Sequence, residues 1–332
     1  MQLRVLFHNN CFDGACSASL FTRFHRECIG TATSYSYTGL HHKAGGQLDT
    51  ADFTGDENAI VDFKYSPSPK INWWFDHHQS AFLTEADRAH FLAEQERTKE
   101  HPQQFFNPDY ISCTELIADI ARERFGFNTT GLEDLLHWAH IIDGAKFESA
   151  EQAVSLAAPA IRLMTVIEAT SDPTFIPRLI PLITEQSLTA TEQEPFVQQA
   201  LQPRLEKHQQ DIALIRARAT EDKGVITFDI TDQPTEGYSK FIPYYLIPQG
   251  NYVVGLSRSS FRTKISVGTN PWTTIPTEKL ANIAAICERY NGGGHARVGA
   301  ISLPADQIDE ARNIAAVITT ELKALNQRNT TT

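Results

Sequence analysis

Three adjacent residues, Asp76-His77-His78, place one carboxylate and two imidazoles directly after an apolar, aromatic run at 71–75. That run has the composition of a short buried strand. Open α/β sheets bind their ligands beyond the carboxyl ends of the strands. Imidazole beside carboxylate suits Mn, Fe or Zn. We therefore expect a metal site here, with a surface turn capped by the aspartate as the alternative reading.

Similar side chains follow other apolar segments. His8 comes after residues 3–7 and is followed by Asp13, Asp62 comes after residues 59–61, and Asp143 ends an apolar helical pattern. The ends of parallel strands share one edge of a sheet, so these distant residues can share a site. Three carboxylates and at least two imidazoles suit a two-metal centre, which holds its ions about 3.5–4 Å apart and attacks phosphorus in line. The alternatives are a turn at His8 and Asp13, a cap at Asp62 and a helix stop at Asp143.

The elements that must position these residues alternate between strands and helices. We expect strands at 3–7, 59–62 and 72–75, a turn at 9–14, and helices at 15–25, 114–125 and 131–142. Such alternation is typical of a parallel sheet covered by helices. The fold class is therefore α/β.

A second, smaller α/β domain is expected after a mainly helical region at 151–219. The patterns predict a connecting helix at 194–219, then strands at 224–232, 251–258, 262–268 and 298–303, and helices at 277–290 and 305–325. We place the first domain at 1–190, a helical linker at 191–222 and the second domain at 223–328, with the active site in a cleft between the domains.

The second domain carries a glycine run, Gly292-Gly293-Gly294-His295, between a predicted helix and a predicted strand. Glycines let backbone N–H groups approach an anion closely. Arg297 follows the run, and Arg258 could clamp a phosphate with two hydrogen bonds. The alternative reading is a plain connection and ordinary solvated cations.

Composition excludes several classes of protein. The formal net charge of −11 lacks the basic footprint of a protein that wraps long nucleic acid. No apolar run is long enough to span a membrane, and the chain starts with a strand pattern rather than a signal peptide. Five cysteines without framework spacing favour a reduced, cytoplasmic compartment.

The order of these motifs resembles that of the DHH phosphoesterase superfamily. The matching segments are His8 to Gly14, Val61-Asp62-Phe63, Asp76-His77-His78, Asp143-Gly144 and Gly292 to His295. They are similar to the branch that carries the DHH-associated C-terminal domain, which includes nanoRNase-like oligoribonucleases, dinucleotide phosphodiesterases and RecJ-type exonucleases. The resemblance covers nearly the whole chain and is specific to the superfamily rather than to a substrate.

The resemblance implies a role for each residue. His8, Asp13, Asp62, His77 and Asp143 would bind two divalent metal ions, Mn by preference and Mg or Co as substitutes, with Asp62 bridging them. His78 would face the scissile phosphate, and Asp76 would orient the histidines. Gly292 to His295, with Arg258 and Arg297, would bind the substrate, and metal-bound water would be the nucleophile.

Many family members carry two aspartates after the first histidine, whereas this chain has only Asp13. We expect Asn10 or water to complete that metal position. Cys11, Cys16, His41, His42, His137 and His140 are expected to be structural.

The expected function is metal-dependent hydrolysis of short linear oligonucleotides, such as dinucleotides, to mononucleotides. The alternatives are a cyclic-dinucleotide phosphodiesterase, a single-strand exonuclease, a nucleotide 3′-phosphatase, and a nucleotide-binding regulator with a degenerate metal site. The expected partners exclude long duplexes and membranes, and a homodimer is an open alternative.

Overall fold

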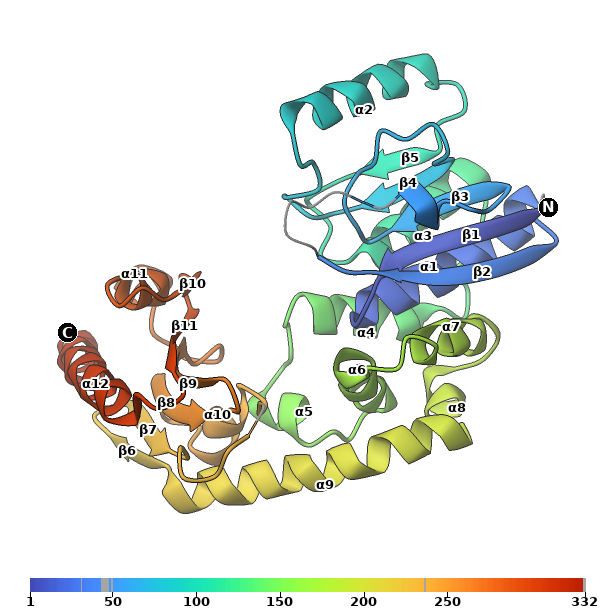
Figure 1. The fold of residues 1–332 in the computed structure, drawn as a ribbon. Coiled ribbons are helices and arrows are strands. Elements are labelled where there is room, and N and C mark those ends of the chain that lie inside the picture. The colour runs from blue at the N-terminus through green and yellow to red at the C-terminus, as the bar shows by residue number, and fades with distance from the viewer. Residues whose placement is uncertain (31, 43–47, 49, 236, 331–332) are drawn as a thin grey trace. The chain divides into compact units, whose positions relative to one another are not determined.

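The computed structural model describes residues 1–30, 32–42, 48, 50–235 and 237–330. The chain divides into two compact units, shown in Figure 1. Unit 1 comprises Met1–Phe147 and Ala157–Gln202, and unit 2 comprises Glu148–Leu156 and Pro203–Thr332. The long helix α9 (Pro195–Arg218), which the sequence predicted as a connecting helix, contributes residues to both units.

Unit 1 is built on a parallel sheet. Its strands are β1 (Gln2–His8), β2 (Ser34–Leu40), β3 (Glu57–Val61), β4 (Trp73–Asp76) and β5 (Gln104–Phe106). They lie in the order β2-β1-β3-β4-β5, and every neighbouring pair is parallel. The carboxyl ends of all these strands therefore meet at one edge of the sheet.

Both faces of this sheet are buried, as parallel sheets require. On one face, Trp73 and Phe75 pack against the ring of Phe21. On the other face, Trp74 packs against Phe91 within a separate apolar cluster. Successive residues of β4 thus point to opposite faces, which explains the continuous aromatic run in the sequence.

The helices of unit 1 cover the sheet. They are α1 (Phe12–Phe24), a π-helix η1 (His25–Ile29), a 3-10 turn η2 (Thr50–Asp52), α2 (Glu85–Arg97), α3 (Cys113–Phe125), α4 (Glu133–Asp143), α6 (Pro159–Ala169), α7 (Phe175–Glu185) and α8 (Leu188–Glu192). Helices α1 and α3 pack against each other and against β1 and β4 respectively (Figure 1). These two helices therefore lie beside the strands whose ends carry the expected ligands.

Unit 2 is built on a mixed sheet. Its elements are α5 (Ala150–Val154), β6 (Thr220–Asp222), β7 (Val225–Asp229), α10 (Ile242–Leu246), β8 (Tyr252–Arg258), β9 (Arg262–Thr269), η3 (Thr277–Lys279), α11 (Ile283–Glu288), β10 (Gly293–His295), β11 (Val298–Pro304) and α12 (Ile308–Thr330). The strands lie in the order β10-β11-β9-β8-β7-β6, with only β7 and β8 parallel among the described pairs. Helix α12 packs on β7, β8 and β9. The α/β fold class expected for both parts of the chain is confirmed.

Some expected elements are wrong in detail. The helix predicted at 277–290 is a 3-10 turn followed by the short α11, because the Asn282 side chain accepts the Ala285 N–H and caps a new helix start. The turn predicted at 9–14 ends earlier, since α1 begins at Phe12 and contains Asp13 in its first turn. Gly293 to His295 is a strand paired with β11 rather than a loop.

Among the described helices, none combines the length and the apolar character that crossing a bilayer requires.

Candidate metal centre

The expected ligands lie at the ends of three neighbouring strands. His8 is the last residue of β1, Asp62 directly follows β3, and Asp76 is the last residue of β4. Strand β2 lies on the other side of β1, so the chain order reverses between β1 and β3. Such a reversal opens a crevice at the carboxyl edge of the sheet, where open α/β folds bind ligands.

Gly14 lets helix α1 approach the end of β1. A Cβ atom at this position would lie 2.2 Å from the carbonyl oxygen of His8, which is far inside van der Waals contact. Only glycine can therefore bring the first turn of α1, with Asp13, next to His8. Glycine after Asp13 has a structural role that the sequence pattern alone explained only as a turn.

The five expected metal ligands converge in unit 1. The Nε2 atom of His77 lies 3.4 Å from Asp62 Oδ1, 3.5 Å from Asp143 Oδ2 and 3.9 Å from Asp13 Oδ2. The Nδ1 atom of His8 lies 3.4 Å from Asp62 Oδ2. Asp62 thus faces His8 with one oxygen and His77 with the other, which is the arrangement required of a carboxylate that bridges two ions.

Several donor atoms of this cluster are buried without a partner. Both carboxylate oxygens of Asp62, the Nε2 atom of His77 and the Nδ1 atom of His8 form no hydrogen bond within the described residues. Buried polar atoms are ordinarily paired, because leaving one unpaired costs about 1–3 kcal/mol. Nitrogen and oxygen donors that face one another without hydrogen bonds fit divalent cations such as Mn.

The carboxylates and imidazoles of the cluster shift one another's pKa values because they are buried close together. Burial opposes ionisation of Asp62, but the imidazoles of His77 and His8 outweigh it and lower the pKa of Asp62 to about 2. Burial likewise opposes protonation of His77, but Asp62 and Asp13 raise its pKa to about 10. Burial and repulsion by Asp62 raise the pKa of Asp143 to about 6, and the same two causes raise that of Asp13. Without cations, protons must compensate the carboxylates.

Hydrogen bonds orient both histidines of the Asp-His-His motif. The Nδ1 atom of His77 donates to the Tyr110 carbonyl oxygen at 3.1 Å, so Nε2 is the ring nitrogen on which a metal ion could replace a proton. The Nδ1 atom of His78 lies 2.7 Å from Asp76 Oδ1. The same oxygen accepts the backbone N–H groups of His77 and His78 at 2.9 and 3.3 Å. Asp76 therefore fixes the backbone turn at His77 and His78 and engages Nδ1 of His78, so Nε2 is the ring nitrogen of His78 that remains for another partner.

Asp13 has a second partner that the sequence did not reveal. Its carboxylate accepts the backbone N–H groups of Cys113 and Thr114 at 2.7 and 3.1 Å, and the Thr114 hydroxyl at 2.6 Å. These groups form the first turn of α3, whose positive end stabilises an anion. Asp13 is thus fixed by a helix a hundred residues further along the chain.

The backbone at Asp62 is unusual. Its φ angle of +57° lies in the left-handed region, which non-glycine residues rarely adopt. Its N–H donates to the Phe75 carbonyl, which ties the end of β3 to β4. Strained conformations of this kind concentrate at functional sites.

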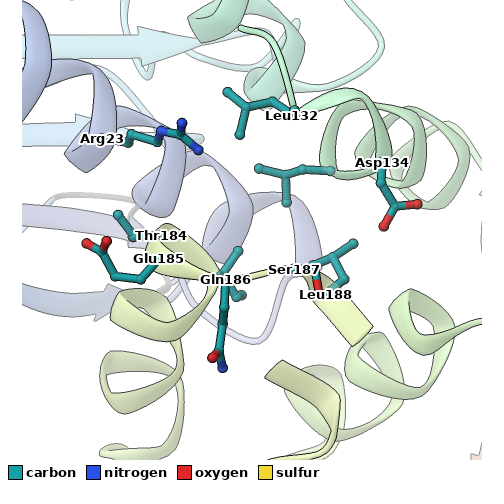
Figure 2. Close-up of a pocket in the computed structure, with 11 residues that line it drawn as sticks. Arg23, Leu132, Asp134, Thr184, Glu185, Gln186, Ser187 and Leu188 are labelled. Atoms are coloured by element: carbon teal, nitrogen blue, oxygen red, sulfur yellow. The ribbon is translucent and has the colours of Figure 1, made fainter. Parts of the chain in front are cut away.

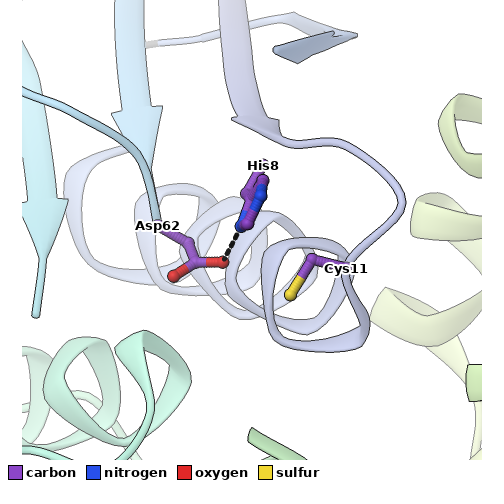
Figure 3. Close-up of side chains that lie close together, drawn as sticks. All are labelled: His8, Cys11 and Asp62. Carbon is purple, nitrogen blue, oxygen red and sulfur yellow. Dashed lines mark ion pairs between the residues drawn. The ribbon is translucent and has the colours of Figure 1, made fainter. Parts of the chain in front are cut away.

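Asn10 and Cys11 are adjacent in the chain but contact different groups. The Asn10 amide donates to the carbonyls of Ile167 and Thr170 at 3.0 and 2.8 Å, which turns it toward the end of α6. The Cys11 sulfur instead lies with donor atoms of His8 and Asp62, all within 4.8 Å of one another (Figure 3). The Asn10 amide nitrogen is thus engaged away from the cluster, whereas the Cys11 thiol lies beside two of the expected ligands.

His42, which the sequence analysis expected to be structural, packs beside His8. Its ring lies edge-on to His8 with centroids 5.0 Å apart and stacks on Phe63 at 4.8 Å. The His42 and Phe63 rings thus flank the imidazole of His8. No spacing rule connects these positions, since β2 and the segment after it bring His42 to the site.

The residues expected to bind substrate lie in unit 2. A Cβ atom on Gly292 or Gly294 would clash with backbone oxygens of β11, at 2.4 and 2.3 Å, whereas one on Gly293 would meet nothing within 4 Å. His295 is exposed. Arg297 donates through Nη2 to the Asn270 carbonyl at 3.1 Å, and Arg258 ends β8 half-buried. Packing of the hairpin therefore explains two of the glycines but not Gly293.

A separate pocket of about 230 Å³ lies elsewhere in unit 1 (Figure 2). Its lining comes from α1, α4, α7 and the start of α8, with Arg23, Asp134 and Glu185 among the residues that line it. None of the expected ligands or substrate-binding residues belongs to its lining. The pocket therefore adds nothing to the candidate metal centre.

No protein-family model and no curated protein sequence matches the chain. Solved structures do match. A pGpG-specific phosphodiesterase, PggH from Vibrio cholerae, superposes with a TM-score of 0.71 at 18% identity, covering 98% of this chain and 99% of that one. The DHH domain of a protein described as a member of a family of ribosomal proteins superposes with a TM-score of 0.52 at 14% identity, covering 97% and 87%. These likenesses concern the fold, and they confirm the expected α/β architecture: the chain shares its fold with PggH over nearly the whole length of both proteins.

Proposed function

We propose that this protein is a metal-dependent phosphodiesterase that hydrolyses short linear oligonucleotides, dinucleotides foremost, to mononucleotides. The observation that carries the proposal is the convergence of His8, Asp13, Asp62, His77 and Asp143 around buried donor atoms that lack hydrogen bonds. This donor set suits two divalent cations, with Mn the first choice. Bound there, the cations would activate water and neutralise charge on the scissile phosphate.

The residues of the chain supply positioning and proton handling. Asp76 holds His78 with its Nδ1 proton engaged, so the Nε2 atom can serve a phosphate oxygen. In the metal-free chain, burial opposes protonation of His78, but Asp76 and Asp62 outweigh it and raise its pKa. His78 is thereby favoured in the cationic form, which suits a contact with an anionic phosphate.

Gly293 supports a role for the glycine run in binding substrate. The fold leaves space for a side chain at this position, so packing within the described chain does not account for its glycine. A backbone without side chains can approach a phosphate or a nucleotide closely. We propose that Gly292 to His295, with Arg258 and Arg297, bind the terminal nucleotide.

The likeness to PggH favours a linear dinucleotide among the alternatives, because that protein is described as specific for pGpG. The net charge of −11 points the same way, since a long single strand would be repelled by the acidic protein.

The test is the turnover of a substrate panel by the full-length protein with Mn. The panel holds a linear dinucleotide, a cyclic dinucleotide, a 3′-phosphorylated nucleotide, a long single strand and pyrophosphate. We expect the linear dinucleotide to be consumed fastest. Asp62→Ala should abolish turnover, whereas Asp306→Ala, which removes an exposed carboxylate of unit 2, should not. If the protein bound nucleotide but turned over no member of the panel, the enzyme proposal would be overturned in favour of a nucleotide-binding regulator.

A second comparison tests the glycine run. Gly293→Ala should fold normally and raise KM for the dinucleotide, because the added methyl group meets nothing in the protein. Gly294→Ala should instead destabilise unit 2, because its φ of +153° and the nearby Val298 carbonyl leave no room for a side chain. An unchanged KM in Gly293→Ala would remove the run from the substrate site.

A further inference from the structure

Cys11 stands at a position where helices ordinarily carry a capping residue. It is the N-cap of α1, where serine, threonine, aspartate and asparagine are preferred because their oxygens accept N–H groups of the first turn. Cysteine is a weak acceptor and makes a poor cap. The local structure of α1 therefore does not explain the choice of this residue.

The Cys11 sulfur lies beside two of the expected ligands of the metal centre. With donor atoms of His8 and Asp62 it forms a triad in which all three atoms lie within 4.8 Å of one another. Figure 3 shows the three side chains side by side at the start of α1, the end of β1 and the end of β3, with an ion pair joining His8 and Asp62. Asp62 is 1% exposed, and neither of its oxygens has a hydrogen-bond partner within the described chain. A buried carboxylate that lies beside a thiol and an imidazole and forms no hydrogen bond marks a position for a cation.

We propose that Cys11 is a metal ligand, so that the metal centre consists of two chemically different positions. The first, formed by His8, Cys11 and Asp62, offers nitrogen, sulfur and oxygen. The second, formed by His77, Asp13 and Asp143 with the shared Asp62, offers nitrogen and oxygen alone. This proposal rests on the proposed function only for the existence of a metal centre and not for its substrate.

The donor sets predict different preferences. Thiolate is a soft ligand that favours Zn, Co or Fe over Mg and Mn, whereas carboxylate-rich positions suit Mn or Mg. We therefore expect the first position to select a thiophilic ion and the second to accept Mn. The single aspartate after His8, which the sequence presented as a missing ligand, is on this view a replacement of oxygen by sulfur.

Cobalt provides a direct readout, because a thiolate bound to Co(II) gives an intense charge-transfer absorption in the near ultraviolet. Full-length protein stripped of metal should develop this absorption on addition of Co(II), with saturation at one ion per chain. Cys11→Ser should lose the absorption and bind the first ion at least about tenfold more weakly. Cys16→Ala is the matched control, since Cys16 is a buried thiol of the same helix that lies outside the triad.

Alkylation gives a second readout that does not depend on spectra. Zn should protect Cys11 from iodoacetamide in the native protein, as measured by mass spectrometry of its peptide, whereas Mg should not. Cys11→Asp should remove the absorption and raise the affinity for Mn. This variant also tests the proposal if Cys11→Ser folds poorly. An absorption that survives in Cys11→Ser, or alkylation of Cys11 that Zn leaves unchanged, would overturn the proposal.

Turnover separates this proposal from the proposed function. Hydrolysis of the linear dinucleotide by a protein that shows no thiolate absorption would overturn the role of Cys11 and leave the enzyme intact. Thiolate absorption in a protein that turns over no member of the substrate panel would uphold the ligand and overturn the function.

Discussion

Removing the carboxylate of Asp143 should stabilise the metal-free protein. Burial and repulsion by Asp62 raise the pKa of Asp143 to about 6, from an ordinary value of 3.8. In the folded state this group holds its proton more tightly than in the unfolded state, so its ionisation opposes folding. The cost is absent below about pH 4 and is fully present above about pH 6.

The magnitude follows from the size of that change. A pKa raised from 3.8 to about 6 corresponds to about 3 kcal/mol at neutral pH. About a quarter of the Asp143 side chain is exposed, so solvent screening reduces this to about 1–2 kcal/mol. We therefore expect Asp143→Asn to raise the free energy of unfolding of unit 1 by about 1–2 kcal/mol at pH 8 and by nothing at pH 4.

The assay is urea unfolding of the EDTA-treated protein, followed by fluorescence of Trp73 and Trp74, which are buried in the sheet of unit 1. Glu96→Gln, which neutralises an exposed carboxylate on α2, is the control and should change little. Saturating Mn should reverse the order, because the wild type gains ligand-linked stability that the variant loses. A variant less stable than the wild type at pH 8 without metal, or equally stabilised at pH 4, would refute the argument from charge crowding.

Two further predictions concern positions that hold the site, and a third concerns a buried histidine elsewhere in unit 1. Gly14→Ala should displace His8, because the added methyl group would meet the His8 carbonyl. The affinity for Mn in calorimetric titrations should fall about 10- to 100-fold. An unchanged affinity would show that α1 can shift without disturbing the site. Asp76→Asn should lower kcat about 10- to 100-fold with a smaller change in KM, because His78 loses the carboxylate that fixes its Nδ1 proton. Equal kcat values for the variant and the wild type would show that Asp76 does not orient His78 for catalysis. Burial lowers the pKa of His25 to about 4, so on acidification the unfolded chain takes up a proton before the folded chain does. The free energy of unfolding should therefore fall by up to about 3 kcal/mol between pH 6.5 and 4. Urea titrations of His25→Gln should show a weaker dependence of the free energy of unfolding on pH.

The sequence predicted the strands that end at the site because their signals are local. Residues 3–7, 59–61 and 72–75 are short apolar runs bounded by polar residues, and they became β1, β3 and β4. Their order in the sheet could also be anticipated in part, since parallel strands place their ends on one edge. The convergence of Asp62 and Asp76-His77-His78 followed from that rule.

Other elements left no such signal. Strand β2 alternates half-buried tyrosines with serines, and α2 buries only Phe91 among its residues, so neither shows an apolar stripe. Cys11, Thr114 and His42 join the site through tertiary contacts with partners far away in the sequence. A pattern of neighbours along the chain cannot reveal contacts of that kind.

The ligands of the metal centre are also spread over time during synthesis. His8, Cys11 and Asp62 leave the ribosome first, whereas Asp143, at the end of α4, is the last of the ligands to emerge. Domains fold as the amino-terminal part of the chain emerges. A nascent chain that stops before residue 143 therefore lacks one carboxylate of the second position, and the ligand set is complete only after the whole parallel sheet and α4 have been made. A product truncated or stalled before Asp143 therefore lacks the full ligand set on which hydrolysis would depend.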